Sequence, residues 1–398
     1  MLVIDNLPLD ITQEDSLPAN LVVLRNEAAI TAVNNCNSSL LNSFDVHLQF
    51  ASALLKYGTE TSSSHFDELQ CKVITNMAYF LQQIAEGLAQ KAFTEDSKEA
   101  WASSGLYNKN AIGLLQFLRR LDLANSPQSL GLVQTYMKCW TISQQLGVVM
   151  LSLSKLRSRI CDTPNTNGGV NSAKNSSNMR YDRLLEFQES DLKDLAKSSL
   201  LYARLCIGCR SACSQLANTH VSSACEPLIQ YLDALTFILL SLDRYKNDDC
   251  GSAIGMLEAA TDCLSTGLIT SKQLKLIQET RKLKHKFSAK WNELKSESTS
   301  IKAKINPFKR KNDSKPTGLH YFLQFTLEDF IIPLMILLHY RYLRTNDKVF
   351  FQPIVRDRQK LLNTWPQGKT PDLVGTTWIF DGEKLREEIN HGAGSEYY

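Results

Sequence analysis

Glycine, proline and long apolar runs are all scarce in this sequence, and each shortage excludes a class of protein. The 398 residues include 18 glycines and 11 prolines, whereas sandwiches and barrels need a tight turn after every short strand. The most apolar run, Phe330–Leu338, contains Pro333 and is far shorter than the roughly 20 residues that cross a bilayer. The net charge of +3 gives no general reason to expect a nucleic-acid ligand. Long helices joined by few loops remain as the prediction.

The motifs that accompany common enzyme chemistry are also missing. The sequence contains no phosphate-binding GxxxxGK[ST] loop, no GxSxG nucleophile turn, no HExxH zinc motif and no kinase signature. The seven histidines, such as His47 and His339, are scattered singly, which is typical of structural histidines rather than metal ligands. We therefore expect no catalytic residues, no metal and no cofactor, and a protein that is not an enzyme.

One cysteine pattern leaves an alternative open. Cys206, Cys209 and Cys213 are spaced so that a helix would present them on one face, where thiolates hold zinc or undergo redox chemistry. The simpler interpretation is a packing face of small residues, because no nearby histidine or second CxxC supplies a fourth zinc ligand. Most of the ten cysteines lie in apolar segments, and Asp5 and Asp10 interrupt any secretory signal. We therefore expect reduced thiols in the cytoplasm.

Helical periodicity is the dominant pattern of the chain. Apolar residues recur at spacings of three and four, without sustained strand alternation. The predicted helices cover residues 20–32, 40–58, 66–88, 101–123, 128–161, 184–216, 227–245, 252–268, 271–305 and 319–344. Short connections indicate antiparallel neighbours stacked as a solenoid like that of tetratricopeptide proteins, although no fixed-period repeat is present. The predicted fold class is all-α.

Breaks in this periodicity predict the domain boundaries. Pro8 and Pro18 exclude a helix from residues 1–18, which we expect to form a short extended or β arm. The helical domain should then cover residues 19–360, and residues 361–398 should form an irregular tail.

Two polar stretches interrupt the predicted domain. Residues 162–179 are rich in asparagine and serine and indicate a flexible surface loop. Residues 271–317 indicate a basic helix and loop, with 14 basic and 4 acidic residues between Lys272 and Lys315. Within it, the basic stretch from Lys302 to Asn312 could bind phosphate, anionic lipid or an acidic partner, and a solvated loop is the other interpretation.

Five segments occur in an order that is shared with a known helical family. They are Cys71–Ala85 with Asn76, Ala78, Ile84 and Ala85; Trp101–Leu118 with Ala111, Gly113 and Leu118; Ser126-Pro127 with the helix through Gln144-Gln145; Gly251–Leu257; and Asn346–Phe350 with Pro353. Together they resemble the Bro domain, the boomerang-shaped helical module of ALIX-type endosomal-sorting (ESCRT) proteins. The fourth segment lacks the glutamate and the arginine of that family, with Ser252 in place of the glutamate, and the fifth is similar to the strand that closes the domain.

Because little chain follows these segments, the sequence resembles in particular the fungal PalC family, in which a Bro domain stands alone. This resemblance implies a non-enzymatic adaptor that binds the C-terminal amphipathic helix of an ESCRT-III filament subunit and components of the ambient-pH signalling complex. It implies recruitment from the cytoplasm to endosomal or cortical puncta at the plasma membrane, through partners and without nucleic acid. The pathway implied is the proteolytic activation of a zinc-finger transcription factor at alkaline pH. A general adaptor in multivesicular-body sorting is the alternative.

The resemblance also implies a binding surface. Bro domains bind the partner helix on an apolar patch of the concave face, which here falls on the fourth and fifth predicted helices. The candidate residues are Phe117, Leu118, Leu121, Leu132, Val133, Tyr136 and Met137. Two neighbouring helices cannot expose all of these, so we expect about half to be core. The lysine-rich helix from Ser271 is a second candidate, as a basic rim that steers an acidic partner.

Overall fold

A computed structural model describes residues 1–9, 17–31, 37–58, 64–121, 127–161, 189–280, 318–372 and 374–388. The predicted loop at 162–179 lies outside these residues, as do residues 281–317 of the basic stretch, so the expectations about both stay predictions. Of the predicted basic helix, only its beginning is described, as α11 (Ser271–Thr280).

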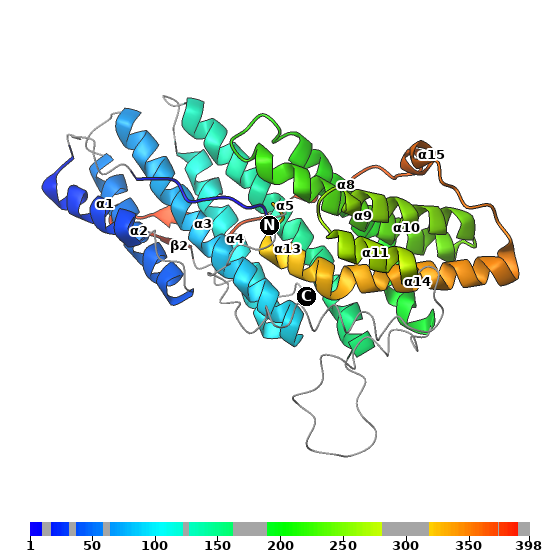
Figure 1. The fold of residues 1–398 in the computed structure, drawn as a ribbon. Helices are drawn as coiled ribbons and strands as arrows, with labels where there is room; N and C mark the ends of the chain where they lie inside the picture. The colour runs from blue at the N-terminus through cyan, green and yellow to red at the C-terminus, as the bar shows by residue number, and fades with distance from the viewer. Residues whose placement is uncertain are drawn as a thin grey trace, which may run out of the picture. The chain divides into compact units, whose positions relative to one another are not determined.

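Within the described residues the fold is all-α, which confirms the prediction from periodicity (Figure 1). The remaining helices are α1 (Ala19–Thr31), α2 (Asn37–Gly58), α3 (Ser64–Glu95), α4 (Lys98–Arg120), α5 (Pro127–Cys161), α8 (Glu189–Ser214), α9 (Ser222–Lys246), α10 (Cys250–Ser265), α13 (Tyr321–Thr326), α14 (Ile332–Thr345) and α15 (Arg358–Asn363). Two π-helical turns, η1 (Leu327–Ile331) and η2 (Asn346–Phe350), flank α14. Two short strands, β1 (Trp378–Phe380) and β2 (Leu385–Glu387), pair antiparallel in the region that we expected to be irregular.

The chain forms two compact units. Unit 1 comprises Met1–Val3 and Gln145–Pro371, and unit 2 comprises Ile4–Gln144 and Asp372–Tyr398. The division falls within α5, so both units contain part of this helix. The arm, domain and tail predicted from the sequence are a different division of the chain and stay predictions.

In unit 2, α3 packs against α2 and α4. Residues of α3 such as Val73, Met77 and Phe80 are buried, because apolar positions at spacings of three and four place them on the faces that meet these neighbours. Ser97 begins α4 as its N-cap, with a side-chain oxygen that accepts a hydrogen bond from the Ala100 N–H. The prediction that a helix occupies this region is therefore correct, although α4 begins before Trp101.

The described N-terminal residues 1–9 form neither helix nor strand, and hydrogen bonds of Asp5 and Leu7 hold them to unit 2. The Leu7 N–H donates to the Asn76 side chain at 2.7 Å, and the Asn76 amide donates to the Leu7 carbonyl at 2.9 Å. The Tyr136 hydroxyl donates to the Asp5 carbonyl at 3.3 Å. Asn76 therefore satisfies both backbone groups of Leu7, which gives a structural role to one of the residues behind the family resemblance.

In unit 1, α9 packs against both α8 and α10, and α10 also contacts α14. Most side chains of α9 from Leu228 to Leu242 are buried, as expected of a helix with helical neighbours on more than one side. The helix begins at Ser222, before Pro227, so the predicted start at Pro227 was too late.

Two helical stretches in the described part of the chain, Ser222–Lys246 and Tyr321–Phe350, are long and apolar enough to cross a membrane. In each, 78% of the apolar window is buried inside the fold. The core helices of many proteins pass the same test of length and composition, so this test does not separate a membrane span from a core helix.

Pro333 explains the π-helical turn η1. A proline in a helix has no N–H for the carbonyl oxygen four residues earlier, which is that of Asp329. The helix widens just before the proline, and the Ile332 N–H donates to the Leu327 carbonyl five residues earlier. The widened turn contains Asp329, whose buried carboxylate accepts a hydrogen bond from Arg157 Nε of α5 at 2.9 Å.

The second π-helical turn corrects a prediction. Asn346–Phe350, which the family resemblance presents as a closing strand, continues α14 as the turn η2. Extended chain begins only after Phe351, where the backbone enters the left-handed region with φ of 51°.

Extended chain after η2 contacts three helices in one repeated way, which we call a glycine crossing. In each crossing, the N–H of one extended residue donates to the carbonyl of a helix residue. The carbonyl of the same extended residue lies against a glycine that follows that helix residue by four positions. The three sets are Val355 with Gly251 and Gly255 of α10, Lys369 with Arg204 and Gly208 of α8, and Thr376 with Lys109 and Gly113 of α4. The first two crossings belong to unit 1 and the third to unit 2. A Cβ atom at Gly255, Gly208 or Gly113 would overlap the carbonyl of the crossing residue, so the close approach requires glycine.

Candidate functional site

The seven predicted docking residues separate into a buried group and a partly exposed group. The buried residues, with exposures between 0 and 6%, are Phe117, Leu118, Val133 and Tyr136. They belong to the core of unit 2, because they lie on the helix faces that meet neighbouring helices. Leu121, Leu132 and Met137 are partly exposed. A partner that docks on the folded surface can therefore contact only these three of the seven.

The partly exposed residues do not form one stripe along α5. Leu132 and Met137 are five residues apart, which separates them by roughly 140° around a helix with 3.6 residues per turn. Met137 shares its side of α5 with the exposed Gln134, one turn earlier. The solvent-facing part of the candidate patch is therefore centred on Met137, with Leu121 at the end of α4.

Two arginines at the end of α4 adjoin this part of the patch. An Arg119 guanidinium nitrogen lies 3.9 Å from the Met137 sulfur. Arg120 donates a hydrogen bond to the Trp378 carbonyl at 2.9 Å, and its guanidinium lies 6.0 Å from the centre of the Phe117 ring. Cations in the last turn of a helix also offset the negative end of its dipole. Both side chains are exposed, so they are available to an anionic ligand.

A hollow of about 380 Å³ lies beside these arginines in unit 2. Its lining residues are Gln116, Arg119, Arg120, Thr376 and Thr377. Among the described residues of this lining, Arg119 and Arg120 are the charged members, and Gln116 adds a polar amide. A carboxylate or phosphate fits this chemistry, because arginine donates paired hydrogen bonds to planar and tetrahedral anions.

Sequence reasoning missed this hollow, because it depends on a contact between distant parts of the chain. Thr376 reaches α4 through its glycine crossing at Gly113, and Trp378 Nε1 donates to the Asn110 carbonyl at 3.2 Å. The sequence does contain one signal for this contact, which is Gly113 in the interior of a strongly helical segment. Such a glycine weakens a helix unless another backbone needs to approach it closely.

The three cysteines of the alternative thiol site lie in an environment that disfavours the thiolate form. Cys206, Cys209 and Cys213 are buried thiols that are not part of a disulfide, and Cys209 Sγ lies 3.1 Å from Gln145 Oε1. Burial raises the pKa of Cys206, and it raises the pKa of Cys209 to about 12. Metal binding and thiol redox chemistry both require the thiolate. Among the described residues, no group of three or more His, Cys, Asp and Glu side chains could hold a metal ion.

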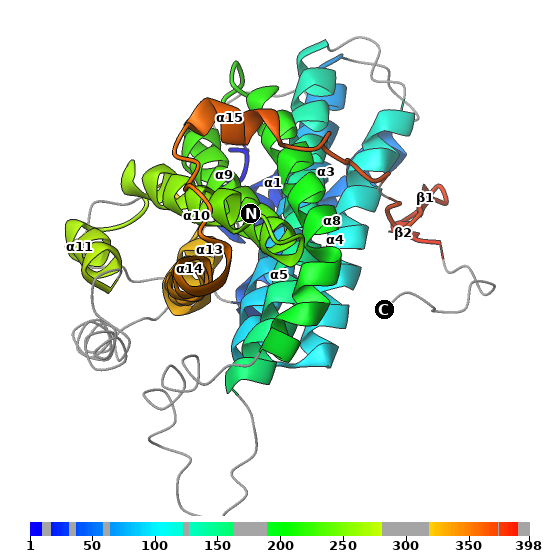
Figure 2. The same ribbon diagram turned by 90° about the vertical axis from the view of Figure 1, so that its right-hand side faces the viewer.

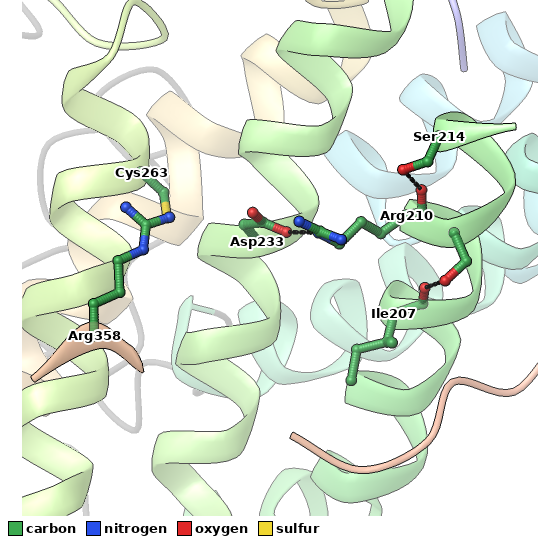
Figure 3. Close-up of polar contacts among 7 residues, drawn as sticks. Ile207, Arg210, Ser214, Asp233, Cys263 and Arg358 are labelled. Carbon is green, nitrogen blue, oxygen red and sulfur yellow. Dashed lines mark hydrogen bonds and ion pairs between the residues drawn. The ribbon is translucent and has the colours of Figure 1, made fainter. Parts of the chain in front are cut away.

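Polar side chains also join the helices of unit 1 (Figure 3). Arg210 of α8 donates to the Asp233 carboxylate of α9 at 2.6 Å, and Arg358 of α15 lies 3.3 Å from Cys263 Sγ of α10. Burial raises the pKa of Asp233, and the Arg210 charge opposes that shift. Because the Arg210 side chain is 40% exposed, this ion pair adds little stability and mainly orients α8 against α9.

The fold and the candidate surface define an all-α protein with an arginine-lined hollow beside a partly exposed apolar patch. The chain belongs to the family described as "Family of unknown function (DUF5355)", which matches residues 65–398. It is also similar to a Saccharomyces cerevisiae (strain ATCC 204508 / S288c) protein, "Uncharacterized protein YGR122W". The two are 30% identical over 407 residues, which cover 96% of this chain and 94% of the yeast protein.

Proposed function

We propose that this protein is a non-enzymatic adaptor of the Bro-domain kind, similar to the PalC family, that binds an amphipathic helix. The proposed ligand is the C-terminal helix of an ESCRT-III filament subunit. In this role the protein links the filament to components of the ambient-pH signalling complex and supports proteolytic activation of a zinc-finger transcription factor at alkaline pH. It moves from the cytoplasm to endosomal or cortical puncta through these partners.

The observation that carries this proposal is the surface at the end of α4. Met137 and Leu121 offer apolar area, and Arg119 and Arg120 offer positive charge beside it. An amphipathic helix with acidic residues next to its apolar face presents the complementary pattern. The apolar residues supply the affinity of such a contact, and the arginines mainly speed the encounter and set its orientation.

A contact between two of the family-like segments supports the resemblance itself. Gly251, at the start of the fourth segment, donates its N–H to the Gln352 side chain at 2.9 Å, next to the fifth segment. Val355 donates its N–H to the Gly251 carbonyl, and its own carbonyl lies against Gly255. The two segments are about 100 residues apart in the chain. Their contact gives both a role in packing, which is a physical reason for a protein of this fold to contain both motifs. The signalling pathway follows from the resemblance alone.

The proposal is tested with a labelled peptide of the ESCRT-III C-terminal helix and fluorescence anisotropy. Met137→Asp should weaken binding about tenfold or more, because a carboxylate replaces apolar contact in a surface that already faces an acidic ligand. Arg119→Glu should weaken binding less and should abolish most of its salt dependence. Tyr136→Asp is a poor test, because Tyr136 is buried and the variant is expected to unfold unit 2.

Leu106→Asp provides a matched control, because Leu106 is an exposed leucine of the same helix α4 with 55% exposure. It should bind the peptide as well as the wild type. Equal binding by wild type and Met137→Asp contradicts the site. The alternative role in general multivesicular-body sorting is separated by cell assays of Met137→Asp. A defect in transcription-factor processing at alkaline pH with normal cargo sorting supports the pH pathway, and the opposite result supports the alternative.

A further inference from the structure

Unit 1 carries a small apolar projection at the end of α14 that the proposed function does not use. Val349 is 63% exposed and Phe351 is 74% exposed, and Pro353 is exposed as well. We call these three residues the apolar tip. Figure 1 shows that the end of α14 extends past the neighbouring ends of α9 and α10 in unit 1, and Figure 2 shows this end from the front. The high exposure of Val349 and Phe351 makes this end a convex projection of unit 1.

The backbone at the tip is in a conformation that does not suit its residue. Phe351 has φ of 51° and ψ of 31°, in the left-handed region. Glycine or asparagine is favoured there, and a bulky aromatic residue is an outlier. Phe351 also gains little burial in the fold, since most of its surface faces solvent. Neither the stability of the turn nor solubility accounts for phenylalanine at this position. An interaction of Phe351 with a binding partner would account for it.

Hydrogen bonds hold the turn in place behind the tip. The buried Asn346 side chain donates to the Gln352 carbonyl at 2.9 Å and accepts from the Gln352 N–H at 3.0 Å. The Gln352 side chain in turn accepts from the Gly251 N–H and donates to the Asp248 carbonyl, at 2.9 and 2.8 Å. Residues on either side of Phe351 are thus fixed to the body of unit 1. The tip presents its apolar side chains without a further loss of backbone entropy on binding.

The surroundings of the tip carry more basic than acidic side chains. Between residues 344 and 360 the exposed basic residues are Arg344, Lys348, Arg356, Arg358 and Lys360, and the exposed acidic residues are Asp347 and Asp357. The Asp357 carboxylate is the N-cap of α15, and Arg356 is paired with Glu258 at 3.4 Å, so Arg344, Lys348, Arg358 and Lys360 remain against Asp347. At the nearby end of α9, Lys246 and Asp248 are both exposed and balance each other. The tip therefore lies in a basic environment.

We propose that the apolar tip is a membrane-contact site that inserts Val349, Phe351 and Pro353 into the surface of an anionic bilayer. Three side chains are too few for a stable protein interface, which buries roughly 800 Å² on each partner. They suffice for a bilayer, where a few apolar side chains at the headgroup boundary act together with basic residues that attract anionic lipid. A convex, pre-ordered tip with basic neighbours matches that requirement.

The experiment is co-sedimentation of the full chain with phosphatidylcholine vesicles that contain or lack phosphatidylserine. The wild type should bind the vesicles with phosphatidylserine and lose binding as salt is raised. Phe351→Asn removes the aromatic ring and places a residue that favours the left-handed region. It should bind these vesicles about tenfold more weakly, in line with the loss of one aromatic side chain from an apolar environment. Its melting temperature should be equal to or higher than that of the wild type.

Matched variants test whether the tip itself is responsible for vesicle binding. Val374→Asn removes an apolar residue of unit 2 that is 78% exposed, and it should leave vesicle binding unchanged. Lys348→Glu should reduce binding only to the vesicles with phosphatidylserine. Wild-type chain that stays in the supernatant overturns the proposal. Vesicle binding by Phe351→Asn equal to that of the wild type overturns it as well. Phe351→Asn should still bind the ESCRT-III helix peptide, so a failure of the membrane site is distinct from a failure of the proposed adaptor function.

Discussion

His47 links the stability of unit 2 to pH through a single buried ring. Its Nδ1 lies 2.7 Å from the Ser43 carbonyl, which only accepts hydrogen bonds, so Nδ1 carries the proton of the neutral ring. The ring meets the face of Phe80 edge-on, with centroids 4.9 Å apart. Burial lowers the pKa of His47 from 6.5 to about 4, and the hydrogen bond to Ser43 opposes this shift. The folded protein therefore keeps His47 neutral at a pH where the unfolded chain protonates it.

The pH dependence that follows has a definite sign. The stability from neutral His47 is fully present above pH 6.5 and is lost as the pH falls toward 4, because the unfolded state binds the proton first. The loss approaches about 3 kcal/mol, since one pKa unit corresponds to about 1.4 kcal/mol. Urea unfolding of wild type and His47→Gln across this range isolates the effect. The stability difference between the two should shrink or reverse on acidification, and a constant difference contradicts the assignment.

Arg157 and Asp329 form the most buried ion pair in the described part of the chain, with side-chain exposures of 6 and 9%. Asp329→Ala should destabilise the protein by about 3–5 kcal/mol, because the Arg157 charge then stays buried without its carboxylate. The double variant Arg157→Met, Asp329→Leu should be less destabilised than Asp329→Ala, since no charge remains in the core. Denaturant unfolding measures both. A double variant that is as unstable as Asp329→Ala shows that packing and not charge controls this contact.

At the scale of elements, the glycine crossings predict opposite results for two similar substitutions. Gly113→Ala places a Cβ against the Thr376 carbonyl and should destabilise the protein by about 1–3 kcal/mol, the usual range for overpacking. Gly131→Ala of α5 is the matched control, because nothing lies within 4 Å of a Cβ there. It should stabilise the protein by about 0.5–1 kcal/mol, as alanine is the better helix former.

Hydrogen exchange locates the effect of Gly113→Ala. The amides of β1 and β2 and the Thr376 N–H should exchange faster in this variant than in the wild type, because the crossing holds this segment against α4. Exchange in α9 of unit 1 serves as the internal reference. Unchanged protection in β1 and β2, together with normal stability, means that the crossing does not anchor them.

The elements themselves were largely predictable, for a physical reason. Apolar residues repeat with the period of a helix, and this pattern is local, so it predicted most helices and the start of α1 near Ala19. The strand at Asn346–Phe350 was expected from the family resemblance and not from a periodicity, and it was wrong because the segment continues α14 as a π-helical turn. The short strands β1 and β2 were missed, since three residues each are too few for an alternating pattern.

At the scale of the whole molecule, the all-α fold class could be predicted from the sequence, whereas the exposure of the candidate docking residues could not. Helix periodicity shows that one face of α4 and α5 is apolar, and it does not show which of those residues another helix covers. Phe117 and Leu118 therefore entered the candidate site together with Leu121, although only Leu121 is partly exposed. The arginine-lined hollow depends on contacts between residues about 260 positions apart, which no local pattern encodes.

The two proposed contacts use different units of the chain. The peptide surface at the end of α4 belongs to unit 2, and the apolar tip belongs to unit 1. Substitutions in one are therefore expected to leave the other intact, since sites without shared neighbours act independently.

The widened turn at Pro333 also has a consequence for the length of the chain. A π-helical turn is equivalent to one extra residue inserted into an α-helix. Deleting one residue of η1 would give a more regular helix, but it would rotate the helix residues that follow by about 100° about the helix axis. Tyr342, whose carbonyl accepts from Cys250, and Asn346, which fixes the turn behind the tip, would both lose their partners. Proteins that share this packing should therefore tolerate changes of residue type in the segment more readily than a change in its number of residues.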